Sequence, residues 1–245
     1  ELEGELPIWA GRTFRYFMWN KGPNGESIPN RSHPLTIYIN GEEVKAIDPL
    51  YHNKDRNRFP EDPQAKLYDQ MTLTWPVDSY GLPEGAPEHS DIKIRFSLLP
   101  EEWRIRRGGG TDTARGIGKK SEGISIVRNY REVWFGPIPY WGRYAKGSAG
   151  GWSRFDPQDR WWGCEILFDA WLDRAFAVKN IKDGAQPLPD LMETIKGNIL
   201  PSRKTATEKI QQTFTATARQ EREEHQRQAN EEDMRRRHAE AERIA

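Results

Sequence analysis

A glycine-rich basic segment, residues 104–120, is the part of this 245-residue sequence whose composition most directly indicates chemistry. It contains five glycines, six basic side chains and a single acid, Asp112. Cations on a flexible segment can neutralise phosphates without reading a base sequence, so the segment is a candidate nucleic-acid site. The alternative is a mobile, solubilising loop, since glycine maximises backbone freedom. The candidate residues are Arg104, Arg106, Arg107, Arg115, Lys119 and Lys120.

The motifs of common catalytic sites are absent or incomplete in the sequence. TARGIGKK (113–120) resembles a P-loop, but Thr113 replaces the first glycine and Lys120 replaces the Ser or Thr that would bind Mg²⁺. The five histidines are scattered, and neither HExxH nor GxSxG occurs. The single Cys164 lies in the apolar stretch WWGCEILF, where we expect a buried, inert thiol. We therefore predict no metal site and no standalone catalytic centre.

Composition divides the chain into two predicted regions. All ten Trp precede residue 172, and Phe214 is the only aromatic residue after Phe176. We predict an α+β domain over residues 1–200 and a charged helical tail over 201–245. Basic and acidic residues balance at 37 each, so no overall field attracts nucleic acid or a membrane. No apolar run approaches the roughly 18 residues of a membrane-spanning helix, and we expect a cytoplasmic protein.

Turn residues and apolar periodicity predict the elements that would position these side chains. Asn40-Gly41 between two alternating runs predicts a type I′ hairpin over 35–47. Apolar residues at helical spacing predict a short helix over 188–200 that ends near Gly197 or Pro201, followed by a separate charged helix. That second helix is either a solvated arm or a partner-binding helix. Further strands are predicted at 12–19, 71–77, 91–99, 123–129, 131–136 and 161–169.

Three stretches resemble the transducer domain of GHKL ATPases, in the branch of MORC-like and MutL-like proteins and their bacterial relatives. They are SEGISIVRNYREVWFG (121–136), DRWWGCEILFD (159–169) and LDRAFAVKNIKDGAQPLPDL (172–191). The predicted hairpin LTIYINGEEVKAIDPL (35–50) also resembles the opening of this domain in the bacterial relatives. The resemblance implies a mixed-sheet α+β domain of the ribosomal-protein-like, domain 2 type.

The resemblance also implies a nucleotide-sensing loop, whose asparagine and lysine correspond to Asn180 and Lys182. Lys182 would act in trans on an ATP-binding domain and contact the γ-phosphate, and Asp183 stands where the family has Gln. The family's Mg-binding asparagine helix, adenine motif and glycine-rich lid do not occur in the sequence. We therefore expect no cofactor in this chain, with ATP and Mg²⁺ bound by an upstream or separate GHKL domain of a homodimeric parent protein.

Two functions remain in view. The first is an energy-transducing module that couples ATP binding and hydrolysis in another domain to conformational change. The second is a freestanding binding module that contacts nucleic acid, DNA included, through residues 104–120. The resemblance does not identify the pathway that the ATPase would serve, because one fold hosts many functions.

Overall fold

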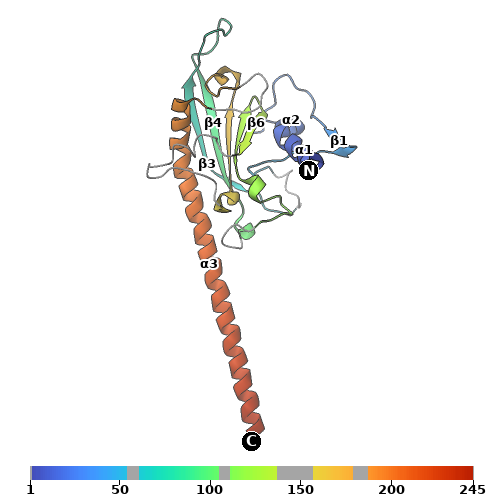
Figure 1. The fold of residues 1–245 in the computed structure, drawn as a ribbon, viewed down its shortest axis with the longest axis vertical. Coiled ribbons are helices and arrows are strands. Elements are labelled where there is room, and N and C mark those ends of the chain that lie inside the picture. The colour runs from blue at the N-terminus through green and yellow to red at the C-terminus, as the bar shows by residue number, and fades with distance from the viewer. Residues whose placement is uncertain (1, 54–60, 105–110, 137–156, 179–186, 245) are drawn as a thin grey trace.

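The computed structural model describes residues 2–53, 61–104, 111–136, 157–178 and 187–244. A sheet lies at the centre of the molecule, and one long helix runs along it and continues far beyond it (Figure 1). The helices are α1 (Leu2–Thr13), α2 (Arg15–Trp19) and α3 (Pro189–Ile244). The short 3-10 helices are η2 (Glu101–Trp103), η3 (Lys119–Ser121), η4 (Pro157–Trp161) and η5 (Ala170–Leu172). The strands are β1 (Tyr38–Ile39), β2 (Glu42–Glu43), β3 (Lys66–Pro76), β4 (His89–Leu98), β5 (Ile124–Arg128), β6 (Arg131–Gly136) and β7 (Trp162–Phe168).

The central sheet has five strands in the order β3-β4-β7-β5-β6. All neighbouring pairs are antiparallel except β5 and β7, which are parallel. A parallel pair needs a crossover connection, and the chain from β6 to β7 supplies it. The predicted α+β class, with a mixed sheet and a long C-terminal helix, is thus confirmed.

Two tight hairpins follow the turn chemistry of the sequence. Asn40 and Gly41 both have positive φ, 53° and 84°, as a type I′ turn requires, and they join β1 to β2. Asn129 and Tyr130 also have positive φ, 45° and 66°, and they join β5 to β6. The predicted hairpin over 35–47 and the predicted strands from 71 onward are confirmed, and β3 begins earlier than expected.

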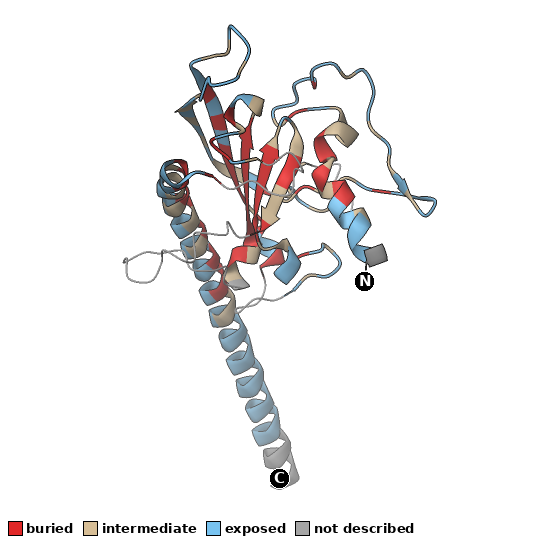
Figure 2. Ribbon diagram, turned by 45° about the horizontal axis from the view of Figure 1, so that its top comes forward, coloured by how far each residue is buried: buried red, intermediate tan, exposed pale blue. Residues whose placement is uncertain are grey.

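Helix α3 covers one face of the sheet and supplies a continuous apolar stripe to the core (Figures 1 and 2). Strand β4 alternates, so that Ile92, Ile94 and Phe96 face α3 while Arg95 and Ser97 face the other side. The helix residues of the stripe recur at intervals of four and seven, as one face of a helix demands. They are Leu191, Ile195, Ile199, Ala206, Ile210 and Phe214.

The predicted helix end near Gly197 or Pro201 is wrong, because α3 continues through both residues. A proline inside a helix removes one hydrogen bond and costs about 3 kcal/mol. Gly197 and Pro201 are both exposed, so the carbonyl left without its donor can be hydrated. The apolar stripe continues from Ile199 to Ala206 on the opposite side, and its burial offsets the cost.

The predicted strand at 12–19 is also wrong, since this segment forms the end of α1 and all of α2. Its aromatic residues favour a strand by propensity, but tertiary contacts override propensity here. Arg15 and Tyr16 are buried against polar side chains of the sheet, and consecutive residues of a strand could not both point that way.

Beyond Phe214 the helix leaves the body, and all side chains from Arg219 to His238 are exposed (Figure 2). Arg237 pairs with Asp233 at 2.8 Å, one of the i, i+4 pairs that stabilise an isolated helix. The predicted charged helix is confirmed for these residues, and its exposed surface is compatible with both a solvated arm and a partner-binding helix. Within the described ranges, no helix is long and apolar enough to cross a membrane.

Candidate functional site

The predicted sensor residues Asn180 and Lys182, with Asp183, lie outside the described residues, but both flanks of their loop are defined. Before the loop, the N–H of Val178 donates to the carbonyl oxygen of Asp173 at 2.8 Å. After the loop, the N–H of Leu188 donates to the carbonyl oxygen of Ala175 at 2.8 Å. The two ends of segment 179–187 are therefore fixed to one turn, residues 172–178, which we call the anchor turn.

The anchor turn is fastened to the end of strand β7 and to strand β5. Phe176 stacks on Phe168 with ring centroids 3.7 Å apart, and both rings are buried. Arg128 at the end of β5 donates from Nη2 to Asp173 Oδ2 at 2.7 Å, and its Nε donates to Oδ1 of the same carboxylate. A two-point arginine–carboxylate contact fixes orientation as well as distance. The anchor turn is thus held to the sheet by a buried ring stack and a two-point ion pair.

The basic segment 104–120 does not form a single cationic surface in the described residues. Arg106 and Arg107 lie outside them. Arg104 is buried, with its Nε donating to the carbonyl oxygen of Pro100, and burial lowers its pKa. Lys119 is exposed.

The remaining basic candidates, Arg115 and Lys120, are bonded to acids. Arg115 donates to both oxygens of Asp62, at 2.6 and 2.8 Å, and to Asp112 at 2.6 Å. Lys120 donates to Glu5 at 2.5 Å. Asp62, Asp112 and Glu5 therefore offset part of the positive charge of the segment within the described residues.

The expectation of a mobile loop is wrong for residues 111–120. Asp112 and Ile117 form an isolated antiparallel bridge, and Ile117 is 1% exposed within the main core. Burial of one large apolar side chain contributes about 1.5–3 kcal/mol, which is enough to hold a short turn in place. The sequence pattern missed this because a single apolar residue carries no periodicity.

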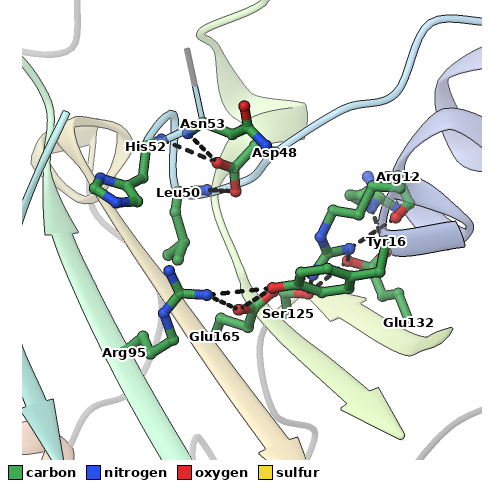
Figure 3. Close-up of polar contacts among 11 residues, drawn as sticks. Arg12, Tyr16, Asp48, Leu50, His52, Asn53, Arg95, Ser125, Glu132 and Glu165 are labelled. Atoms are coloured by element: carbon green, nitrogen blue, oxygen red, sulfur yellow. Dashed lines mark hydrogen bonds and ion pairs between the residues drawn. The ribbon is translucent and has the colours of Figure 1, made fainter. Parts of the chain in front are cut away.

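A buried ionic network on the other face of the sheet was not predicted (Figure 3). Glu165 at the middle of β7 lies between Arg95 of β4 and the helical residues Arg15 and Tyr16. Tyr16 donates its hydroxyl to Glu165 Oε1 at 2.6 Å, Arg95 donates to the same oxygen at 3.2 Å, and Arg15 donates to Oε2. These side chains are all buried.

A second carboxylate extends the network to strand β6. Glu132 accepts from Arg15 at 3.0 Å, from Ser125 at 2.6 Å and from Arg12 at 2.5 Å. The network therefore connects α1 and α2 to strands β4, β7, β5 and β6. Although burial alone would raise it, the charges of Arg15 and Arg95 lower the pKa of Glu165 below its ordinary value. Glu165 is thus ionised at neutral pH, and its role is to attach the helices to the sheet.

One signal in the sequence pointed to this network. Glu165 interrupts the apolar stretch WWGCEILF, and Ser125 interrupts the apolar strand around it. A charge inside a fully buried strand needs an ionic partner, and Arg15 supplies it from a segment 150 residues away. The neighbouring Cys164 is buried, and burial raises its pKa, in agreement with the expected inert thiol.

The segment after β2 forms a turn around Asp48 and closes over the same sheet face (Figure 3). The Asp48 carboxylate accepts the backbone N–H groups of Leu50, His52 and Asn53 at 2.8–3.0 Å. This turn lies so close to β7 that a Cβ on Gly163 would be 2.5 Å from a backbone oxygen of residue 49. Glycine is therefore required at position 163 for the segment to reach the sheet.

A cavity of about 700 Å³ opens between α1, residues 43–51, the turn at 115–121 and strand β6. Trp9, Val44, Ile47 and Phe135 are among the apolar residues of its wall, and Arg12 also lines it. In the described part of the chain, no group of three or more His, Cys, Asp or Glu side chains is arranged to hold a metal ion.

Comparisons with family models, with curated proteins and with solved structures returned no match for this chain.

Proposed function

We propose that this chain is the energy-transducing module of a dimerising GHKL ATPase. It would couple ATP binding and hydrolysis in a separate ATP-binding domain to a change in domain geometry. The proposal starts from the resemblance of residues 121–136 and 159–191 to the family's transducer domain.

One structural observation supports the proposal most: the anchor turn holds both ends of the sensor loop and is bonded to the start of α3. Leu188, which is bonded to Ala175, immediately precedes the first residue of the helix. Leu188 thus lies between segment 179–187 and α3 in the chain, and a displacement of the segment would reach the helix through this residue. A module that converts a ligand contact into a domain movement needs this direct connection between the contact and a long rigid element.

Lys182 is the residue we assign to nucleotide sensing, with Asn180 beside it. An ammonium bonded to the γ-phosphate makes a charge-assisted contact that exists before hydrolysis and is lost when the phosphate leaves. Such a contact differs between the two nucleotide states, and only a differential contact can bias a conformational equilibrium. ATP and Mg²⁺ would be held by the partner domain, and the parent protein would act as a homodimer.

The test replaces single lysines in the full-length parent ATPase. Lys182→Ala should lower ATP turnover about ten- to a hundredfold, the loss expected for one charged hydrogen bond of about 1.5–3 kcal/mol in the transition state. Lys179→Ala is the matched control, because it removes the same charge three residues away at a position outside the motif. Turnover near wild type in both variants, with the fold intact by circular dichroism, would contradict the assignment.

A further inference from the structure

The cavity beside α1 has the size and lining of a small-ligand site. Its volume of about 700 Å³ lies within the usual range of such sites, roughly 300–1,000 Å³. Two elements frame it firmly, because the N–H of Ile47 donates to the carbonyl oxygen of Gly11 at 2.9 Å. Trp9 of α1 is 46% exposed and presents a large apolar surface at the opening.

Nearly all the charged side chains of the described lining are neutralised by one another. The pairs are Glu5 with Lys120, Glu43 with Lys45 and Asp62 with Arg115. The remaining acid, Asp48, is buried and accepts three backbone N–H groups. Arg12 is the least exposed cation of the described lining, at 18%, whereas the paired Lys45 and Lys120 are 79% and 85% exposed.

Arg12 presents an unused donor pair to the cavity. Its Nε donates to Glu132, and its Cζ lies 4.1 Å from the centroid of the Phe135 ring, which also lines the cavity. Its two terminal amino groups have no partner within the described residues. Glu132 is shared with Arg15, and the buried network holds three arginines against two glutamates. The network therefore carries one excess positive charge, and Arg12 is the arginine of the network that lines the cavity.

We propose that this cavity binds a small organic carboxylate with an aromatic or branched apolar body. The carboxylate would accept two hydrogen bonds from the Arg12 amino groups, because the planar guanidinium matches carboxylate geometry. The apolar body would lie against Trp9, Val44 and Ile47. This binding site is independent of the nucleotide-sensing role proposed above.

The test uses the whole 245-residue chain and two probes of closely similar shape, one anionic and one neutral. These are 1-naphthaleneacetate and its neutral analogue 1-naphthaleneacetamide, titrated by calorimetry and by tryptophan fluorescence. The carboxylate should bind about tenfold or more tightly than the amide, since the charge-assisted contact is present only for the carboxylate. Equal affinity of the two probes, or no binding of either at millimolar concentration, would overturn the proposal.

Three variants locate the binding. Arg12→Lys keeps the positive charge opposite Glu132 but removes the two terminal amino groups of the guanidinium. It should therefore abolish the preference for the carboxylate. Ala46→Trp places a bulky side chain in the cavity wall while Arg12 itself is kept, and should weaken both probes at least tenfold; it also keeps the test valid if the Arg12 variant does not fold. Arg174→Lys is the control, because Arg174 likewise stacks on a ring, Tyr80, and pairs with an acid, Asp78. Unchanged binding in Ala46→Trp, or an equal loss in Arg174→Lys, would place the probe elsewhere and refute the site.

Discussion

Leu188 donates its backbone N–H to the carbonyl oxygen of Ala175 at 2.8 Å, and helix α3 begins at the next residue, Pro189. This single bond joins the start of the longest element to the turn that ends strand β7. The start of α3 is therefore tied to the anchor turn, while the apolar stripe from Leu191 to Phe214 packs the helix against the sheet.

Arg128 and Asp173 should prove energetically coupled. Each of the changes Arg128→Ala and Asp173→Ala should lower the free energy of unfolding, and a double-mutant cycle by urea denaturation should give a coupling of about 1 kcal/mol. The value is modest because Asp173 is 35% exposed and solvent screens the pair. Strictly additive effects would show that this contact does not hold the anchor turn.

Glu165→Gln should lower the free energy of unfolding by about 3 kcal/mol or more, because it leaves Arg15 and Arg95 buried with reduced compensation. Glu223→Gln is the control: Glu223 pairs with Arg219 on the exposed arm, and its loss should stay within about 0.5 kcal/mol. Chemical denaturation of both variants checks the difference. Similar small effects would mean that the network contributes little to stability.

The same carboxylate predicts how stability depends on pH. The pKa of Glu165 is lower in the folded protein than in the unfolded chain, so the unfolded chain binds more protons as pH falls. Its stabilising contribution is complete above the ordinary glutamate pKa of about 4.3 and is lost as pH falls through the lower folded value. Unfolding free energies between pH 7 and 3 should fall more steeply for wild type than for Glu165→Gln. Parallel curves would contradict this assignment.

Two glycines should respond oppositely to alanine. Gly197 is exposed in the middle of α3, with open space where a methyl group would be added, so Gly197→Ala should stabilise the protein by up to about 1 kcal/mol. Gly163→Ala should destabilise it, because the new Cβ would meet a backbone oxygen at 2.5 Å. Thermal unfolding separates the two outcomes, and a neutral Gly163→Ala would show that residues 48–51 do not press on β7.

The parts of the fold that the sequence predicted are those governed by local chemistry. Asn40-Gly41 determined a hairpin because few other pairs adopt two positive φ angles, and the alternating strands could be read from their own residues. Residues 12–19 misled because their aromatic side chains favour a strand, whereas their position depends on buried carboxylates more than 100 residues away. The helix end predicted near Pro201 was wrong for a related reason. The apolar residues of α3 on both sides of Pro201 pack against the sheet, and this packing depends on residues distant in the sequence.

The sites show the same division. Asn180 and Lys182 were assigned by resemblance of a contiguous stretch, and that assignment stays a prediction. The cavity brings together six separate segments, and no local pattern marks it. Arg12 is a candidate binding residue because it lines the cavity and because three arginines share two glutamates around it. Both features depend on the folded structure and not on spacing along the chain.

The length of the exposed part of α3 also screens the charges at its tip from the charges on the body. Ile244 lies 30 residues beyond Phe214, the last core residue of the helix, which is about 45 Å along the axis. The screening length at physiological ionic strength is about 8 Å, so charges at the tip and charges on the body do not influence each other. A movement of the helix can displace its tip over that distance, but a change of charge on the body cannot act on the tip. Whatever binds near residue 244 would therefore do so under its own local field, whichever ligand occupies the body.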